Sequence, residues 1–252
     1  MTLCNTWKGD VESLVRALSL IDDLGPDERL GLRGLPLRLA HIEAGQDIVR
    51  QGEDPVESCL LIDGFVCRYK TLSRGQRQIL SFHFPGEIPD LQSLRLKLMD
   101  HSLGALVASR VAFIAHEAID ALVRQSPGVQ RALWKATLVD ASIFREWLAG
   151  VGRRSAYERT AHLFCEMFVR MKLLGLAPAK SFHLPITQHD IADALGLSAV
   201  HVNRTLQDLR RDGLIATRGR YFSVEDWTRL RAVADFDPLY LHLRTPFCPD
   251  LA

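Results

Sequence analysis

The sequence has no long apolar run and no closely spaced pair of cysteines. No window of 18 or more apolar residues is free of charged side chains, so we expect no membrane-spanning helix. The segment MTLCNTWKGDVESL lacks the basic start and apolar run of a secretory signal, and we therefore expect a cytoplasmic protein. The five cysteines are irregularly spaced, and no C-x-x-C motif occurs. A disulfide framework, a zinc site and an iron–sulfur cluster thus have no support in the sequence.

The short motifs of several enzyme classes are also missing. The sequence contains no Gly-x-Ser-x-Gly, no P-loop and no H-E-x-x-H. A cupin-like metal enzyme would need clustered ligands, typically H-x-H followed by Glu, and His83 has no second histidine at that spacing. We predict that the chain is not an enzyme and has no catalytic or metal-binding residues. The cupin-like enzyme is the alternative, which metal analysis of the purified protein would test.

Charge is unevenly distributed, although the formal net charge of the chain is only +1. Residues 151–222 hold eleven Lys and Arg against six Asp and Glu, so the rest of the chain carries four net negative charges. A basic block beside an acidic one is typical of proteins in which the basic part contacts phosphates. The distribution therefore favours nucleic acid as the partner of the C-terminal half.

Short apolar runs separated by turn residues occupy residues 37–115. Alternation at this spacing, with turns at Asp63-Gly64 and Arg74-Gly75, predicts an antiparallel β sandwich or barrel. Residues 10–33 have a helical pattern that breaks at Gly25-Pro26. Residues 91–99 predict a short helix between strands.

A long helix is predicted to begin at Pro127, with Ser126 as its N-cap. Apolar residues then recur every three or four positions over roughly 25 residues. Because one small sandwich cannot easily cover so long a stripe, we expect a second copy of the chain to cover it. The alternative is that the stripe packs wholly within its own chain. Gly150 and Gly152 predict a hinge after this helix. The residues expected in the dimer interface are Leu133, Ala136, Val139, Ile143 and Trp147.

Residues 184–224 carry the most informative pattern. Thr187 and Asp190 form a close match to a capping box and predict the start of a helix. Gly196 can end that helix in the left-handed conformation, and Ser198 can cap a second helix over residues 199–211. The segment GLIATRGRYFSV that follows predicts a β-hairpin wing with a basic tip. The skeleton matches a helix-turn-helix in Ile191, Ala192, Leu195, Gly196, Leu197 and Val202.

Outward residues near the start of the second helix are expected to read base edges in the major groove. Arg204 can donate two hydrogen bonds to guanine, Asn203 can pair with adenine, and Val200 can touch a thymine methyl group. For Arg204 the alternatives are a phosphate contact or a surface ion pair. The predicted base-reading residues are Val200, His201, Asn203 and Arg204. The residues predicted to contact phosphates are Thr187, Gln188, Ser198, Arg218 and Arg220.

This order of parts resembles the Crp/Fnr family of bacterial transcription regulators. The strongest similarity lies in ITQHDIADALGLSAVHVNRTLQDLRRDGLI (186–215), and AGQDIVRQGEDPVESCLLIDGFVCRY (44–69) resembles the family's early β-roll. The resemblance implies a homodimer that binds palindromic double-stranded DNA, with signal input through the β-roll and RNA polymerase as a further partner. It implies an α+β fold: an antiparallel β-roll sensor of the cyclic-nucleotide-binding type with N-terminal helices (1–125), a dimerisation helix and hinge (126–152), and a winged helix-turn-helix domain with a C-terminal tail (153–252).

The sequence departs from the family's pattern at the candidate effector pocket. Cyclic-nucleotide binders of the family carry Gly-Glu and Arg-Ser where this chain has Pro89-Asp90 and His101-Ser102. Without that arginine to pair with the cyclic phosphate, we do not expect cyclic AMP to bind. Iron–sulfur members carry an N-terminal cysteine cluster, and Cys4 stands alone here, so we expect no such cluster.

Two other signals stay open, and the chain departs from the family's pattern at one further place. The alternatives for the signal are haem, with His83 or His101 as ligand, and a redox sensor at Cys59 or Cys67. The reading helix keeps only the arginine of the family's usual set, so we expect a different half-site. The tail after Asp226 has no role that the sequence predicts.

Overall fold

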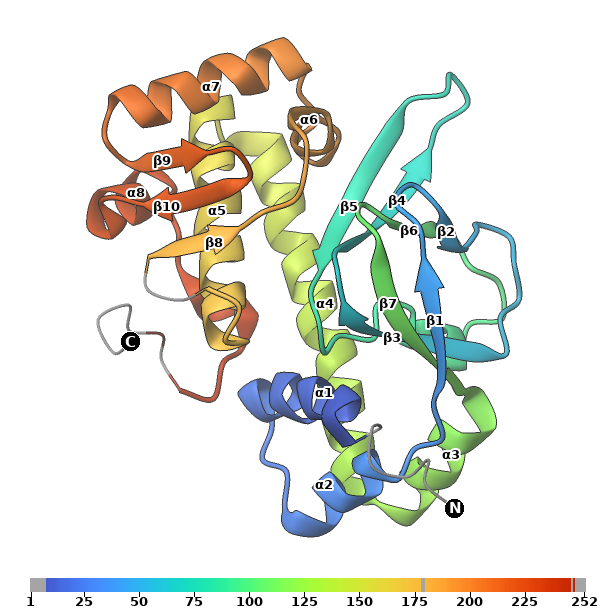
Figure 1. Ribbon diagram of the computed structural model, residues 1–252. Helices are drawn as coiled ribbons and strands as arrows, with labels where there is room; N and C mark the ends of the chain where they lie inside the picture. The colour runs from blue at the N-terminus through green and yellow to red at the C-terminus, as the bar shows by residue number, and fades with distance from the viewer. Residues whose placement is uncertain (1–7, 178–179, 246, 248–252) are drawn as a thin grey trace. The chain divides into compact units, whose positions relative to one another are not determined.

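The structure is a computed structural model of the chain, and it describes residues 8–177, 180–245 and 247 (Figure 1). For residues 8–10 it describes the backbone alone. The chain divides into two compact units. The first combines the residues up to Thr71 with Leu80–Asp140, and the second combines Leu72–Ile79 with the residues from Ala141 onward. No helix within the described ranges is long and apolar enough to cross a membrane.

Two helices and two antiparallel sheets begin the chain, as predicted for a β-roll preceded by helices. The helices are α1 (Lys8–Ile21) and α2 (Pro26–Arg33). One sheet has the order β1-β7-β3, built from β1 (Arg38–Ile42), β7 (Ser109–Ala115) and β3 (Glu57–Asp63). The other has the order β2-β6-β4-β5, built from β2 (Asp47–Val49), β6 (Ser102–Ala105), β4 (Val66–Thr71) and β5 (Arg77–His83).

The β-roll buries one apolar cluster and depends on a glycine at one of its turns. Gly64, between β3 and β4, has φ +104°, and a Cβ there would lie 2.2 Å from Ser109 Oγ. No other residue fits this turn, because a side chain would meet both backbone strain and a steric clash. The cluster consists of Val49, Cys59, Leu61, Val66, Met99, Leu103, Ala105 and Val111.

Two elements near the end of the first unit differ from the sequence-based expectation. The helix predicted over residues 91–99 is only a single 3₁₀ turn, η1 (Leu91–Leu94). Met99 N donates instead to Glu53 O at 2.9 Å, so the end of this segment is fixed by a non-helical hydrogen bond. A helix that the sequence analysis did not assign, α3 (His116–Gln125), follows β7 directly.

The long helix α4 (Pro127–Arg153) runs without a break. Its start is as predicted, because Ser126 Oγ accepts a hydrogen bond from Val129 N at 3.3 Å. The hinge predicted at Gly150 and Gly152 is wrong. Both glycines are helical, and Arg154 N still donates to Gly150 O at 3.0 Å, so the chain leaves the helix only at Arg154-Ser155.

The remainder of the second unit is a helical core with a small sheet. Ser155 caps α5 (Ala156–Leu173) through a capping box with Glu158, and most of α5 is buried. The sheet has the order β8-β10-β9, and the two helices α6 and α7 lie between β8 and β9 in the chain. Their bounds are β8 (Ser181–His183), α6 (Gln188–Leu195), α7 (Ala199–Arg211), β9 (Ile215–Arg218) and β10 (Tyr221–Val224).

The C-terminal tail packs on α5. It forms α8 (Trp227–Val233) and the 3₁₀ turn η2 (Pro238–Leu241). Tyr240 stacks on His162 with ring centroids 5.7 Å apart, and its hydroxyl donates to buried Glu166 at 2.9 Å. The tail therefore supplies part of the core of this unit, a role that the sequence analysis had not found.

Candidate nucleic-acid interface

Local capping builds the helix-turn-helix as the sequence predicted. Thr187 Oγ1 accepts from Asp190 N at 3.1 Å, and Thr187 N donates back to Asp190 Oδ2 at 2.8 Å, which starts α6. Gly196 ends α6 with φ +62°, in the left-handed region that glycine adopts without strain. Ser198 Oγ accepts from His201 N at 3.2 Å and starts α7.

The inward faces of α6 and α7 hold the two helices together. Residues of the predicted skeleton are buried on both helices, and Leu197 in the turn is half-buried. Helix α7 packs against both α5 and α6. The opposite face of α7 is therefore the one that remains available. The buried residues are Ile191, Ala192, Leu195, Val202, Leu206 and Leu209.

The structure exposes three of the four predicted base-reading residues. Val200 is 81% exposed, and His201 and Arg204 are also exposed. No ion pair of Arg204 occurs within the described residues, so the surface ion pair considered from the sequence is not formed. Asn203 is half-buried, and its Nδ2 donates to Gln188 Oε1 at 3.0 Å. Base reading by these four side chains stays a prediction.

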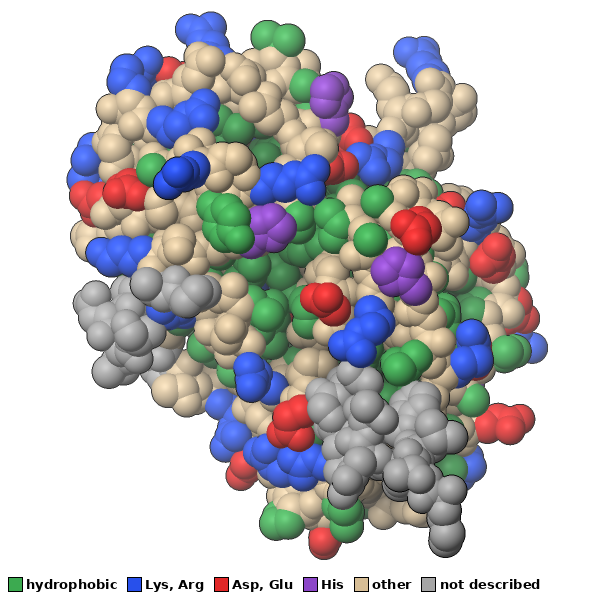
Figure 2. Space-filling model, in the orientation of Figure 1, with side chains coloured by type: hydrophobic (Ala, Val, Ile, Leu, Met, Phe, Trp, Pro, Cys, Tyr) green, Lys and Arg blue, Asp and Glu red, His purple; other side chains and the backbone are tan. Residues whose placement is uncertain are grey.

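The wing is a two-stranded hairpin with a basic tip. Strands β9 and β10 pair antiparallel with Arg218 opposite Tyr221, and Gly219 turns between them with φ +62°. Arg218 and Arg220 are exposed at this tip. Of the other predicted phosphate contacts, Thr187 and Ser198 are exposed and Gln188 is half-buried. Figure 2 shows Lys and Arg side chains over the part of the second unit that carries α7 and the wing.

The interface predicted on α4 is largely on the wrong face. Leu133, Val139 and Ile143 are buried within the chain at 6–9% exposure, so a second copy cannot reach them. Ala136 and Trp147 are half-buried, and Trp147 Nε1 donates to Glu166 at 3.0 Å. The large apolar side chains that α4 exposes are Trp134, Leu138, Leu148 and Val151.

The candidate effector residues of the β-roll form hydrogen bonds within the protein. Asp90 is buried and accepts from Cys59 N at 2.8 Å, and burial raises its pKa to about 7. Buried His101 lies 2.7 Å from Asp100 Oδ1 and 3.3 Å from Gln92 Nε2. Ser102 Oγ accepts from Gln51 N at 3.0 Å.

Arg68 is the residue of this region that sequence reasoning missed. It lies on β4, is 4% exposed, and donates through Nε to Pro89 O at 2.6 Å. Its Nη1 pairs with Asp140 on α4. Alternation from buried Val66 was the available signal, because residues two apart on a strand share a face. The β-roll therefore has an internal arginine, although from a different place in the sequence than the family's Arg-Ser.

The residues considered for haem and redox sensing are occupied or buried. His83 is buried, with Nε2 2.8 Å from Ser81 Oγ and Nδ1 2.9 Å from Glu87 Oε2, so both ring nitrogens are engaged. Cys59 and Cys67 are buried, and burial raises the pKa of the Cys59 thiol, which disfavours the reactive thiolate. Within the described part of the chain, no group of three or more His, Cys, Asp or Glu could hold a metal ion.

Two protein families match separate parts of the chain. Residues 39–126 match the cyclic nucleotide-binding domain family, and residues 158–233 match the Crp-like helix-turn-helix domain family. The chain is 26% identical to the transcriptional activator protein anr of Pseudomonas aeruginosa, over 85% of each chain. It is 27% identical to the transcriptional activator protein FnrL of Cereibacter sphaeroides, over 77% of this chain and 79% of that protein.

Among solved structures, FixK2 from Bradyrhizobium japonicum is similar to this chain. The TM-score is 0.73 at 26% identity, covering 79% of this chain and 98% of FixK2. A β-roll, a long helix and a winged helix-turn-helix with an exposed basic face define a DNA-binding transcription regulator and not an enzyme. The chain belongs to the Crp/Fnr family of these regulators.

Proposed function

We propose that the chain acts as a homodimer in which each protomer places α7 in the major groove of one half of a palindromic site. The observation that carries this proposal is the exposure of Val200, His201 and Arg204 at the start of α7. Two half-sites read by a two-fold dimer lie about one helical turn, roughly 34 Å, apart. In this arrangement Thr187, Ser198 and the wing arginines contact the phosphates on either side.

The exposed apolar face of α4 supports the dimer. Trp134, Leu138 and Leu148 project from one side, because at 3.6 residues per turn they fall within an arc of about 80° around the helix. They are 67%, 55% and 74% exposed, and large apolar side chains gathered this way on a helix are typical of an interface. We propose this face, in place of the buried stripe predicted from the sequence, as the seam between protomers.

The signal enters through the β-roll in this proposal, and the effector is not cyclic AMP. The internal arginine Arg68 is already paired with Asp140 and Pro89 O, so a cyclic phosphate would have to displace these partners. Asp140 lies on α4, which gives the β-roll a direct contact with the proposed dimer helix. We also propose RNA polymerase as a partner, which the activator names of the relatives support, and the cytoplasm as the place of action.

Selection of bound duplexes from a random pool, with no effector added, tests the DNA-binding proposal. The expected result is an enriched palindrome with half-sites one turn apart. Enrichment of a single half-site would contradict the dimer, and no enrichment would contradict effector-independent DNA recognition. Calorimetric titration with cyclic AMP is the separate test of the effector, and saturable binding would contradict that part alone.

A further inference from the structure

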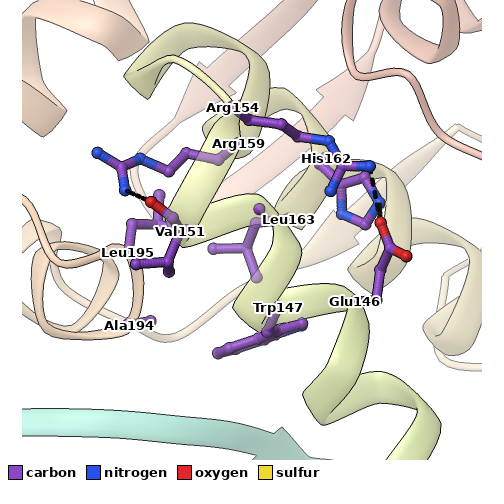
Figure 3. Close-up of a pocket in the computed structure, with 10 residues that line it drawn as sticks. Glu146, Trp147, Val151, Arg154, Arg159, His162, Leu163, Ala194 and Leu195 are labelled. Carbon is purple, nitrogen blue, oxygen red and sulfur yellow. Dashed lines mark hydrogen bonds and ion pairs between the residues drawn. The ribbon is translucent and has the colours of Figure 1, made fainter.

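A pocket in the second unit lies at the junction of α4 and α5 (Figure 3). Its empty volume is about 300 Å³, a figure that includes open solvent at its mouth, so this pocket encloses a ligand only in part. The last residues of α6 close one side. The residues that matter for its chemistry are Glu146, Trp147, Arg154, Arg159, His162 and Leu195.

Unpartnered hydrogen-bond donors set this pocket apart. Four buried side-chain nitrogens in the described part of the chain have no hydrogen-bond partner, and all four belong to residues that line the pocket. They are Nε and Nη1 of Arg154, Nε of Arg159 and Nε2 of His162. The three arginine nitrogens are donors, and a buried donor without an acceptor is costly, so their collection at one place indicates that an acceptor binds there.

The charges around the pocket do not balance. Arg154 Nη2 donates to Glu146 Oε1 at 2.7 Å and to Asp235 O at 3.3 Å, and the exposed Asp235 carboxylate is 4.0 Å away. Arg159 Nη1 reaches only the Val151 carbonyl, at 3.4 Å, and desolvation lowers the pKa of Arg159. Two guanidinium groups thus line the pocket together with a single carboxylate, that of Glu146.

His162 does not add a positive charge. It is 5% exposed, and its Nε2 lies 3.2 Å from Glu146 Oε1 without the alignment of a hydrogen bond. Burial first, and then the nearby Arg154, lower the pKa of His162 to about 3. Phe236 and Tyr240 cover its ring from the tail side. The imidazole is therefore a neutral, fixed part of the lining near pH 7.

The lining between the donors is apolar. Figure 3 shows Arg154 and His162 turned toward Glu146 on one side and Arg159 directed toward Val151 on the other, with Leu163 between them. Leu163 and Leu195 are buried, and the indole of Trp147 adds an aromatic surface. Guanidinium groups match the geometry of carboxylates, and an apolar surface favours a carbon skeleton.

We propose that this pocket binds a small organic carboxylate, whose oxygens accept hydrogen bonds from the unpartnered arginine donors and whose carbon chain lies against Leu163 and Leu195. The site goes beyond the proposed function, because it involves neither DNA nor the β-roll. A dicarboxylate offers one carboxylate for each of the two arginines, whereas a monocarboxylate offers only one. Inorganic phosphate offers oxygens but no carbon chain.

Titration calorimetry on the full chain, at constant ionic strength, tests this site with adipate, butyrate and inorganic phosphate as probes. The expected result is saturable binding of adipate with a dissociation constant on the order of 1 mM or lower, tighter than that of butyrate and of phosphate. Absence of saturable binding by either carboxylate would overturn the proposal. Phosphate binding as tight as adipate would overturn it as well, since the apolar surface would then contribute nothing.

Arg159→Gln should weaken adipate binding at least about tenfold, because it removes a charged donor. Arg153→Gln is the matched control, since Arg153 is exposed, neighbours the pocket in sequence and does not line it. Equal loss in both variants would overturn the site. Arg159→Lys keeps the charge and loses the forked donors, so its affinity for adipate should lie between those of Arg159→Gln and Arg153→Gln. It is the variant to measure if Arg159→Gln does not fold. A duplex-binding assay on the same variants separates failure of this site from failure of the DNA proposal.

Discussion

Asn203 and Gln188 join the two helices of the DNA-binding motif. Asn203 Nδ2, on α7, donates to Gln188 Oε1, on α6, at 3.0 Å, and Gln207 Nε2 donates to Asn203 Oδ1 at 2.9 Å. This hydrogen bond therefore joins Asn203, which is predicted to read a base, to Gln188, which is predicted to contact a phosphate. The Asn203 amide is oriented before DNA arrives, which lowers the entropic cost of ordering it on binding.

Replacing Gln188 by alanine should therefore weaken specific binding about two- to tenfold, the range of one hydrogen bond of about 0.5–1.5 kcal/mol. Discrimination should fall mainly at the base pair that Asn203 contacts. Fluorescence anisotropy with duplexes changed at single positions measures both effects. Gln207→Ala is the control, because it removes the other bond to Asn203 without removing a predicted phosphate contact. Unchanged discrimination in Gln188→Ala would show that the bond does not orient Asn203 for reading.

Substitutions of Arg204 and of Arg218 should change DNA binding in different ways. Arg204→Ala should cost about 1–3 kcal/mol and relax the preference at one base pair, because a bidentate contact to guanine is lost. Arg218→Ala should weaken all duplexes alike and reduce the salt slope by about one unit, because one phosphate contact is lost. Binding isotherms at several salt concentrations separate the two. Identical behaviour of the variants would refute the assigned roles.

Leu138→Glu should shift the protein from dimer to monomer. The side chain is 55% exposed on α4, and a carboxylate there would oppose its counterpart across the proposed seam. Sedimentation velocity measures the change, and affinity for a palindrome should fall with it. Val56→Glu places the same charge at a 75% exposed apolar position of the β-roll and should remain dimeric. A Leu138→Glu protein that stays dimeric would place the interface elsewhere.

Asp90 should make the β-roll less stable as pH rises. Its pKa is raised to about 7 in the folded chain, so between its ordinary acidic value and about pH 7 the folded state holds a proton that the unfolded state has released. The free energy of unfolding should therefore fall over this interval, by at most about 1.4 kcal/mol for each step of one in pH. Asp90→Asn keeps an oxygen for Cys59 N and cannot ionise.

The gain in stability of Asp90→Asn over the original protein should thus grow from pH 5 to pH 8 in denaturant titrations. His83 and His101 contribute in the opposite direction, because burial lowers their pKa values, but they are common to both proteins and cancel in the difference. A difference that does not change with pH would contradict the raised pKa.

Local sequence signals located the DNA-binding motif, whereas features that depend on contacts between distant residues were not predicted. The caps at Thr187 and Ser198 and the left-handed Gly196 act within a few residues, so the sequence alone located α6 and α7. Arg68 pairs with Asp140, 72 residues away, and no local pattern predicts such a partner. The face of α4 was misassigned because the helix carries apolar residues on more than one side, and their period does not say which side its own chain covers.

The prediction based on the two glycines near the end of α4 was also wrong, because the helix does not use their conformational freedom. Gly150 and Gly152 permit a bend, but the i to i+4 hydrogen bonds of α4 continue through both, so freedom alone does not make a hinge. For the tail, Phe236 and Tyr240 carry no motif, and only their packing around His162 reveals their role.

The packing of the tail limits where this regulator can be truncated or fused to another protein. Similarity to the Crp-like helix-turn-helix family stops at residue 233, yet the aromatic rings that enclose His162 and the hydroxyl that reaches Glu166 come from Phe236 and Tyr240. A chimera or truncation designed to the homology limit would leave a buried carboxylate one donor short and open an aromatic core to water. Fragments that end beyond Phe247 keep this core whole, because the Phe247 ring packs on Phe168 and Trp227.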